Sequence, residues 1–111
     1  MLNKEYRINT KKEYNNIYKK GKKIPGRYMV VFIVPGDKAY SRYGFVASKK
    51  VGNAVHRNRA KRRLRTIVYS NMSYIKDSVD IVIVARPAVN EASLDEVNTE
   101  YIRIMRKAGL C

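Results

Sequence analysis

The stretch that decides the fold is Arg42–Val68, RYGFVASKKVGNAVHRNRAKRRLRTIV, in a chain of 111 residues. Its first part, Arg42–Ser48, carries aromatic and β-branched residues, which favour a strand. Gly52 and Asn53 interrupt this pattern, and a helix is expected to begin near Val55. The stretch therefore predicts a strand that leads directly into a helix.

The expected helix has two different sides when its residues are placed at intervals of about 100°. The apolar side gathers Ala60, Leu64, Ile67 and Val68. The polar side gathers Asn58, Arg59, Arg62 and Arg65. We expect the first set to face the core and the second set to face outward.

Two further strands are expected around this helix. Asp80–Ala85 (DIVIVA) is a continuous apolar run, typical of a central strand that is covered on both faces. Because a strand–helix–strand unit joins parallel strands, we expect this run to pair in parallel with Arg42–Ser48. Tyr28–Val34 (YMVVFIV) predicts another strand, and the turn at residues 35–37 favours a hairpin with Arg42–Ser48. More irregular strand can also form between residues 24 and 43.

Capping boxes predict one helix near each end of the chain. The first opens with Thr10-x-x-Glu13, and Gly21 should end that helix. Its apolar face carries Tyr14, Ile17 and Tyr18. The second opens with Ser93-x-x-Glu96, and Gly109 should end it. Its buried stripe is expected to hold Leu94, Val97, Tyr101, Ile104, Met105 and Ala108.

The predicted order is thus helix, two strands, helix, strand, helix, in a single domain over residues 1–111. The longest apolar runs are far shorter than the roughly 20 residues that span a bilayer. The N-terminus has no stretch like a signal peptide, and a single cysteine, Cys111, allows no internal disulfide. These features predict an intracellular protein outside the membrane.

The formal net charge of +15 favours a polyanionic partner. No acidic residue occurs between Asp37 and Asp77, a segment with eleven Lys and Arg residues. A solvated basic helix normally intersperses Glu to form ion pairs, so the uncompensated charge indicates that phosphates supply the counter-charge. Arg predominates from Arg57 to Arg65 and suits bidentate contacts, while Lys49, Lys50 and Lys61 act as point charges. The start of the helix near Asn53 can offer backbone N–H groups to a phosphate.

The aromatic residues of the first helix allow two interpretations. Tyr14 and Tyr18 lie among Lys11, Lys12, Lys19 and Lys20, and rings beside cations make a stacking platform for unpaired bases. Core packing explains their spacing equally well. The hydroxyl groups favour at least partial exposure.

No catalytic constellation is expected in the chain itself. His56 is the only histidine, and its place in the basic run favours a phosphate contact or a local capping role. Asp95 and Glu96 are adjacent but match the dipole at a helix start. No convergent carboxylates for a metal nuclease are visible.

The segment Gly44–Val55, GFVASKKVGNAV, followed by Arg57-Asn58-Arg59, Lys61-Arg62 and Arg65, resembles the signature of the bacterial ribonuclease P protein component. The order of the other elements agrees over nearly the whole chain. The resemblance implies a single-domain α+β sandwich, a mixed sheet packed with three helices, and a left-handed strand–helix–strand crossover. The common crossover would be right-handed.

The resemblance also implies a function and its residues. Ribonuclease P, an endonuclease, removes the 5′ leader from precursor tRNA, and its RNA subunit holds the catalytic site and Mg²⁺. The protein binds that RNA and the leader, raising substrate affinity and supporting metal use, in the bacterial cytoplasm. The implied RNA-subunit contacts are Lys49, Lys50, Asn53, Arg57, Asn58, Arg59, Lys61, Arg62 and Arg65. The implied leader contacts are Tyr14, Tyr18, Val30 and Phe32, with Lys49 and Lys50 near the edge of their cleft.

Two departures and two rival functions accompany this interpretation. The aromatics of the family's first helix are often Phe, whereas both are Tyr here. The basic tail that some members carry is not expected after Gly109. The main rival is a ribosomal or RNA-chaperone-like protein with no catalytic partner. The other is a free-standing metal nuclease. No DNA partner is expected.

Overall fold

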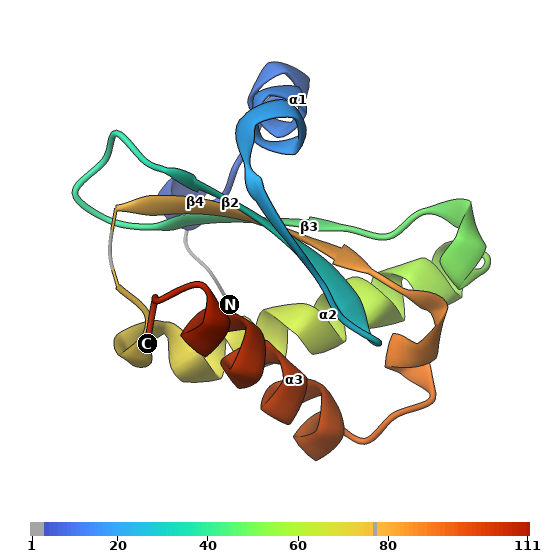
Figure 1. Cartoon of the computed structure of the whole chain (residues 1–111). Helices are drawn as coiled ribbons and strands as arrows, with labels where there is room; N and C mark the ends of the chain where they lie inside the picture. Colours follow the sequence, from blue (N-terminus) through green and yellow to red (C-terminus); the bar gives the residue numbers. More distant parts are fainter. Residues whose placement is uncertain (1–3, 77) are drawn as a thin grey trace.

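The computed structural model describes residues 4–76 and 78–111 and contains one mixed sheet with three α-helices (Figure 1). The elements in chain order are α1 (Lys11–Lys20), β1 (Lys22–Pro25), β2 (Met29–Pro35), β3 (Arg42–Val46), α2 (Ala54–Asn71), β4 (Val79–Ala85) and α3 (Leu94–Lys107). Short 3₁₀ turns lie at Lys4–Tyr6, η2 (Lys49–Val51), Met72–Tyr74 and Pro87–Asn90. The short strand β1 falls within the region where irregular strand was expected.

The strand order is β1-β2-β4-β3, and it confirms one expected pairing and overturns another. β3 and β4 pair in parallel, as the strand–helix–strand unit predicts. The hairpin expected between β2 and β3 is wrong, because β4 lies between them and pairs antiparallel with β2. Asp80, Ile81, Val82, Ile83 and Ala85 of β4 are all buried, as expected for a strand at the centre of the sheet. β2 forms its hairpin with β1 instead. The left-handed sense of the β3–α2–β4 crossover stays a prediction.

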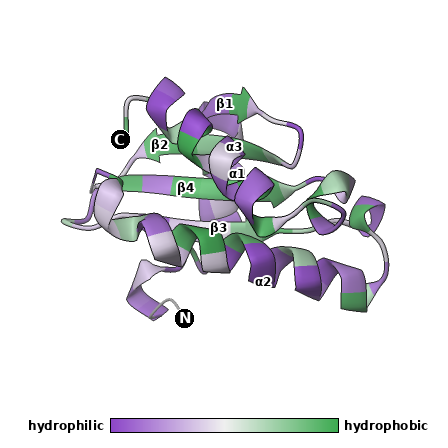
Figure 2. Cartoon of the chain, turned by 90° about the horizontal axis from the view of Figure 1, so that it is seen from below, coloured by the Kyte–Doolittle hydropathy of each residue, from purple (hydrophilic) through white to green (hydrophobic). Residues whose placement is uncertain are grey.

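The two faces of the sheet are covered unequally. Figure 1 shows α1 alone on one face and α2 with α3 on the other. Alternation along β2 sends Met29 and Val31 into the larger core under α2 and α3, while Val34 packs with Ile17 of α1 in a smaller cluster. Hydrophilic and hydrophobic residues alternate along α2, as expected for a helix with one side in the core (Figure 2). Val30, Phe32, Val46 and Val84, on the face that α1 covers, are only half-buried, so part of this face stays accessible.

The buried stripes of the longer helices follow the predicted periodicity closely. The predicted apolar side of α2, Ala60, Leu64, Ile67 and Val68, is buried. In α3 the buried predicted residues are Val97, Tyr101, Ile104 and Met105. Leu94 is wrong as a core residue, since its side chain is 44% exposed at the first position of the helix. Ala108 is only half-buried.

Glu100 occupies a buried place on α3 that the apolar pattern did not predict. Its carboxylate accepts hydrogen bonds from the backbone N–H groups of Arg27 (2.8 Å), Tyr28 (2.8 Å) and Met29 (3.2 Å). Hydrogen bonds to a charged group are worth roughly 1.5–3 kcal/mol each. Glu100 therefore fixes the β1–β2 turn against α3.

The helix ends confirm most of the predicted signals. Ser93 and Glu96 form the full capping box, each side chain accepting from the other residue's backbone N–H. The Thr10 hydroxyl oxygen accepts from the Glu13 N–H, and the same hydroxyl donates to the Glu13 carboxylate. Gly21 ends α1, with its N–H on the Ile17 carbonyl. These caps set where α1 begins and ends over the sheet.

Candidate RNA interface

The start of α2 is built by a glycine and an asparagine. Gly52 has a φ of 137°, which side chains rarely adopt, and a Cβ there would lie 2.9 Å from the His56 Cβ. The Asn53 Oδ1 accepts the His56 backbone N–H at 3.1 Å. The His56 Nδ1 lies 2.8 Å from the same oxygen and donates to it, because the oxygen can only accept. His56 thus has the local capping role that was one of its two predicted roles.

The residues predicted to bind the RNA subunit form one surface along η2 and the first half of α2. We call it the basic face. Its exposed members are Lys49, Lys50, Asn53, Asn58, Arg59, Arg62 and Arg65. Arg57 and Lys61 are half-buried beside them. The Oδ1 of Asn53 is engaged in the cap, so only its amide nitrogen is left to face outward.

Among the described residues, the positive charges of the basic face have no acidic partners. Within residues 4–76 and 78–111, the ion pairs join Arg42 to Glu13 and Asp80, and Arg103 to Glu100. None of these pairs involves the basic face. Its charges therefore repel one another in the free protein, as the missing acidic residues predicted.

Arg63 lies in the same basic run but has a structural role. One of its Nη atoms donates to the Ala92 carbonyl, in the loop before α3. Asn90 of the same region donates to the His56 carbonyl at 3.0 Å. These two contacts brace α2 against the segment between β4 and α3. Helix periodicity separates Arg63 from the outward-facing arginines.

The residues predicted to bind the leader gather on the opposite face of the sheet. The rings of Tyr14 and Tyr18 are 6.4 Å apart, and those of Tyr18 and Phe32 are 5.0 Å apart in an edge-to-face arrangement. We call these three rings the aromatic row. Tyr18 is 37% exposed, and Tyr14 and Phe32 are half-buried. The three rings are therefore partly packed against the protein and partly accessible to a ligand.

Sheet register explains why the aromatic row runs across the strands. Lys23 pairs with Phe32, Phe32 with Val82, and Val82 with Gly44, so these four positions form one line across the sheet. The Lys23 Nζ lies 5.9 Å from the centre of the Phe32 ring, at the β1 edge. Val30 lies in the neighbouring line, opposite Val84. The structure thus brings three of the four predicted residues together, with Val30 adjacent to them.

Gly44 makes room for one end of the aromatic row. A Cβ at this position would lie 2.6 Å from the Tyr14 hydroxyl oxygen, so the ring rests directly on the strand backbone. Burial raises the pKa of the Tyr14 hydroxyl above its ordinary value, although a backbone hydrogen bond with Phe45 and the charge of Arg65 oppose the rise. Burial also raises the pKa of Tyr18. Both hydroxyls therefore stay protonated near neutral pH.

Arg65 connects the two predicted binding surfaces. Its guanidinium carbon lies 5.6 Å from the centre of the Phe45 ring, on the α2 side of β3. The backbone of the same Phe45 bonds with Tyr14 on the α1 side. The sequence did not predict this relation, because it depends on the edge position of β3.

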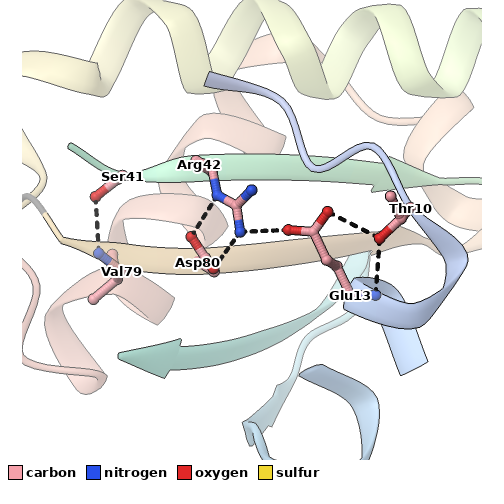
Figure 3. A network of polar contacts seen from close by, with 6 residues as sticks. All are labelled: Thr10, Glu13, Ser41, Arg42, Val79 and Asp80. Atoms are coloured by element: carbon pink, nitrogen blue, oxygen red, sulfur yellow. Dashed lines mark hydrogen bonds and ion pairs between the residues drawn. The ribbon is translucent and has the colours of Figure 1, made fainter. Parts of the chain in front are cut away.

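An ionic clasp holds α1 over the sheet (Figure 3). Arg42 of β3 donates to both Asp80 oxygens, at 3.2 and 2.8 Å, and its Nη2 lies 2.6 Å from Glu13 of α1. Hydrogen bonding to Asp80, partly opposed by burial, raises the pKa of the Arg42 guanidinium above its usual range. Burial alone would raise the pKa of Glu13, but hydrogen bonds from Thr10 and Arg42 outweigh it and lower that pKa.

In the part of the chain that the structure describes, no three His, Cys, Asp or Glu side chains converge as metal ligands. Asp95 and Glu96 lie in the first turn of α3, where Glu96 is engaged in the capping box. Across the same described residues, no helix is long and apolar enough to cross a membrane.

Comparison with known proteins places the chain in a family. The ribonuclease P family model matches residues 2–109. The ribonuclease P protein component of Syntrophomonas wolfei is 44% identical over 110 residues, which cover 99% of this chain and 92% of that protein. The protein component of Alkaliphilus metalliredigens is 34% identical over 104 residues and 94% of each chain.

Solved structures agree with the sequence relatives. A mutant of the Staphylococcus aureus RNase P protein, described as defective in mRNA degradation activity, superposes with a TM-score of 0.87 at 31% identity. The match covers 97% of this chain and 92% of that one. The RNase P protein of Thermotoga maritima gives a TM-score of 0.82 at 28% identity, over 91% and 96% of the two chains. The chain belongs to the ribonuclease P protein family and is an RNA-binding protein of tRNA processing.

Proposed function

We propose that this chain binds the catalytic RNA of ribonuclease P through the basic face and binds the 5′ leader of precursor tRNA through the aromatic row. The observation that carries the proposal is the acid-free surface of η2 and α2 in a chain of this family. As a protein component of ribonuclease P, the chain has RNA as its expected partner. The endonuclease then acts on precursor tRNA with both components present.

The geometry of the basic face supports the contact with the RNA subunit. Arg59, Arg62 and Arg65 are exposed and free of ion pairs within the described chain, so their guanidinium groups are available to phosphates. Lys49 and Lys50 extend this charge to the end of β3. Counter-ion release from the RNA would supply much of the affinity.

The aromatic row supports the contact with the leader. A leader is single-stranded, and its unpaired bases can stack on rings that are partly exposed, as Tyr18 is. Lys11, Lys12, Lys19 and Lys20 lie on the same helix as the two tyrosines, and Lys23 lies beside Phe32, so positive charge is available for the phosphates. Because α1 and α2 lie on opposite faces of the sheet, the protein can contact leader and RNA subunit together (Figure 1).

The chemical step is assigned to the partner. Mg²⁺ would be held mainly by the RNA subunit, since the described side chains of this chain provide no cluster of metal ligands. The protein would raise substrate affinity and support metal use by lowering the repulsion between leader and RNA subunit. The proposed location is the bacterial cytoplasm, where tRNA precursors are made.

A cleavage assay at low Mg²⁺ tests the proposal. A bacterial ribonuclease P RNA is mixed with precursor tRNAs that carry leaders of different lengths, with and without the protein. The protein should stimulate cleavage, more for substrates with a leader that reaches the aromatic row. No stimulation and no dependence on leader length would instead favour a ribosomal or chaperone-like protein. Cleavage by the protein alone would favour a free-standing nuclease.

A further inference from the structure

The second half of α2 carries an exposed aromatic residue that the core does not use. Tyr69 is 58% exposed and lies four residues after Arg65 and seven after Arg62. On an α-helix this spacing places the three side chains on the same side, with Tyr69 about one turn beyond Arg65. Along α2, the exposed arginines Arg62 and Arg65 of the basic face are therefore followed by the aromatic ring of Tyr69.

The surface around this ring is hollowed. Arg62, Arg65, Thr66, Tyr69 and Ser70 all line one shallow pocket on the outer side of α2. The Thr66 hydroxyl donates to the Arg62 carbonyl at 3.0 Å, and the Ser70 hydroxyl donates to the Thr66 carbonyl at 2.8 Å. Because each hydroxyl proton is engaged by the helix, the two oxygens face a ligand as hydrogen-bond acceptors. The pocket thus combines cations, acceptors and one aromatic ring.

We propose that this pocket holds one unpaired nucleotide of the partner RNA, with its base stacked on Tyr69 and its phosphate bound by Arg62 and Arg65. The base amino group or ribose 2′-hydroxyl would donate to Thr66 or Ser70. An unpaired nucleotide is required, because a base inside an RNA duplex has no free face for a ring to stack on. The proposal rests on the proposed function, in which this RNA is the catalytic subunit.

Charge favours RNA over a protein as the occupant of this pocket. The pocket is lined by Lys61, Arg62 and Arg65 and by no acidic residue, so its own charge is positive. The pocket is also separate from the aromatic row, since α1 and α2 cover opposite faces of the sheet (Figure 1). It therefore provides a site for the RNA subunit rather than for the leader.

The test measures binding of the intact protein to a bacterial ribonuclease P RNA as a function of salt. The variants are Tyr69→Leu, Tyr69→Phe and, as a matched control, Tyr74→Leu, which removes a ring that is 68% exposed outside the pocket. Tyr69→Leu should weaken binding roughly 5- to 150-fold, the usual effect of losing one stacked base. The slope against salt should not change, because no phosphate contact is lost. Tyr69→Phe and Tyr74→Leu should bind as the wild type does.

Chemical probing of the RNA gives an independent measurement. The wild-type protein should protect an unpaired nucleotide that Tyr69→Leu leaves reactive. Equal affinity of Tyr69→Leu and the wild type, or an equal loss with Tyr74→Leu, would overturn the proposal. If Tyr69→Leu binds normally while the wild type still stimulates cleavage, the pocket is wrong and the proposed function stands. If the wild type does not bind the RNA at all, both fail.

Discussion

Arg42 and Glu13 form a 2.6 Å ion pair that ties α1 to an edge strand of the sheet. The same guanidinium also bonds Asp80, so removing it leaves two carboxylates without their partner. We expect Arg42→Gln to lower the free energy of unfolding by about 1.5–3 kcal/mol or more, the range for one hydrogen bond to a charged group. Urea denaturation at neutral pH measures the change. Arg106→Gln, at an exposed position of α3, is the control and should leave the free energy of unfolding unchanged. Equal losses of stability in the two variants would contradict the stabilising role of the Arg42 ion pairs.

Acid should weaken the same clasp. The folded state lowers the pKa of Glu13 below its ordinary value of 4.5, so its ionised form stabilises the fold above that pH. The contribution is lost as the pH falls through the lowered folded pKa. The stability difference between wild type and Glu13→Gln should therefore be constant near neutral pH and shrink below about 4.5. Urea titrations from pH 7 to pH 3 measure it, and a difference that grows in acid would contradict the assignment.

Gly44→Ala should disturb Tyr14 specifically. The added methyl group would meet the Tyr14 ring and hydroxyl, and such overpacking typically costs about 1–3 kcal/mol. In a Tyr14→Ala background the methyl group has space, so the cost should largely disappear. Urea denaturation of the four proteins forms a double-mutant cycle. The same cost in both backgrounds would show that the strand itself, rather than Tyr14, requires glycine.

Tyr18→Leu tests stacking on the leader. Loss of one stacked base should cost roughly 1–3 kcal/mol of affinity for precursor tRNA with a leader. Tyr18→Phe keeps the ring and should retain most of that affinity, while Tyr74→Leu serves as the control for an exposed tyrosine elsewhere. Affinity for a tRNA without a leader should not change. If Tyr18→Leu melts the fold while the remaining native protein binds normally, Tyr18 is a core residue.

The sequence predicted the helices well because their signals are local. Periodicity separated the buried Leu64 from the exposed Arg62, and the Ser93 capping box marks the start of α3. The strand order could not be predicted in the same way. Strands that are neighbours in sequence usually pair, whereas here β4 lies between β2 and β3. The apolar continuity of Asp80–Ala85 could have indicated that it separates the other two strands.

The polar contacts that position the site could not be predicted from the sequence, for a related reason. Glu100 bonds the backbone near Tyr28, some 72 residues away, and Arg42 reaches Asp80 across 38 residues. Such pairs depend on which strand occupies which place. Stacking by Tyr14 and Tyr18 was one of two interpretations of the sequence, and the resemblance added Phe32. Only the register shows why Gly44 lies beneath Tyr14.

The central claim is that the basic face binds the catalytic RNA, and the salt dependence of that binding tests it most directly. Arg59→Ala/Arg62→Ala is compared with Arg103→Ala/Arg106→Ala, which removes the same charge from α3. Each lost phosphate contact should reduce the log–log slope by about 0.7–0.9. We predict a shallower slope and weaker binding for the first variant and little change for the second. Equal slopes for both variants and the wild type would contradict the claim.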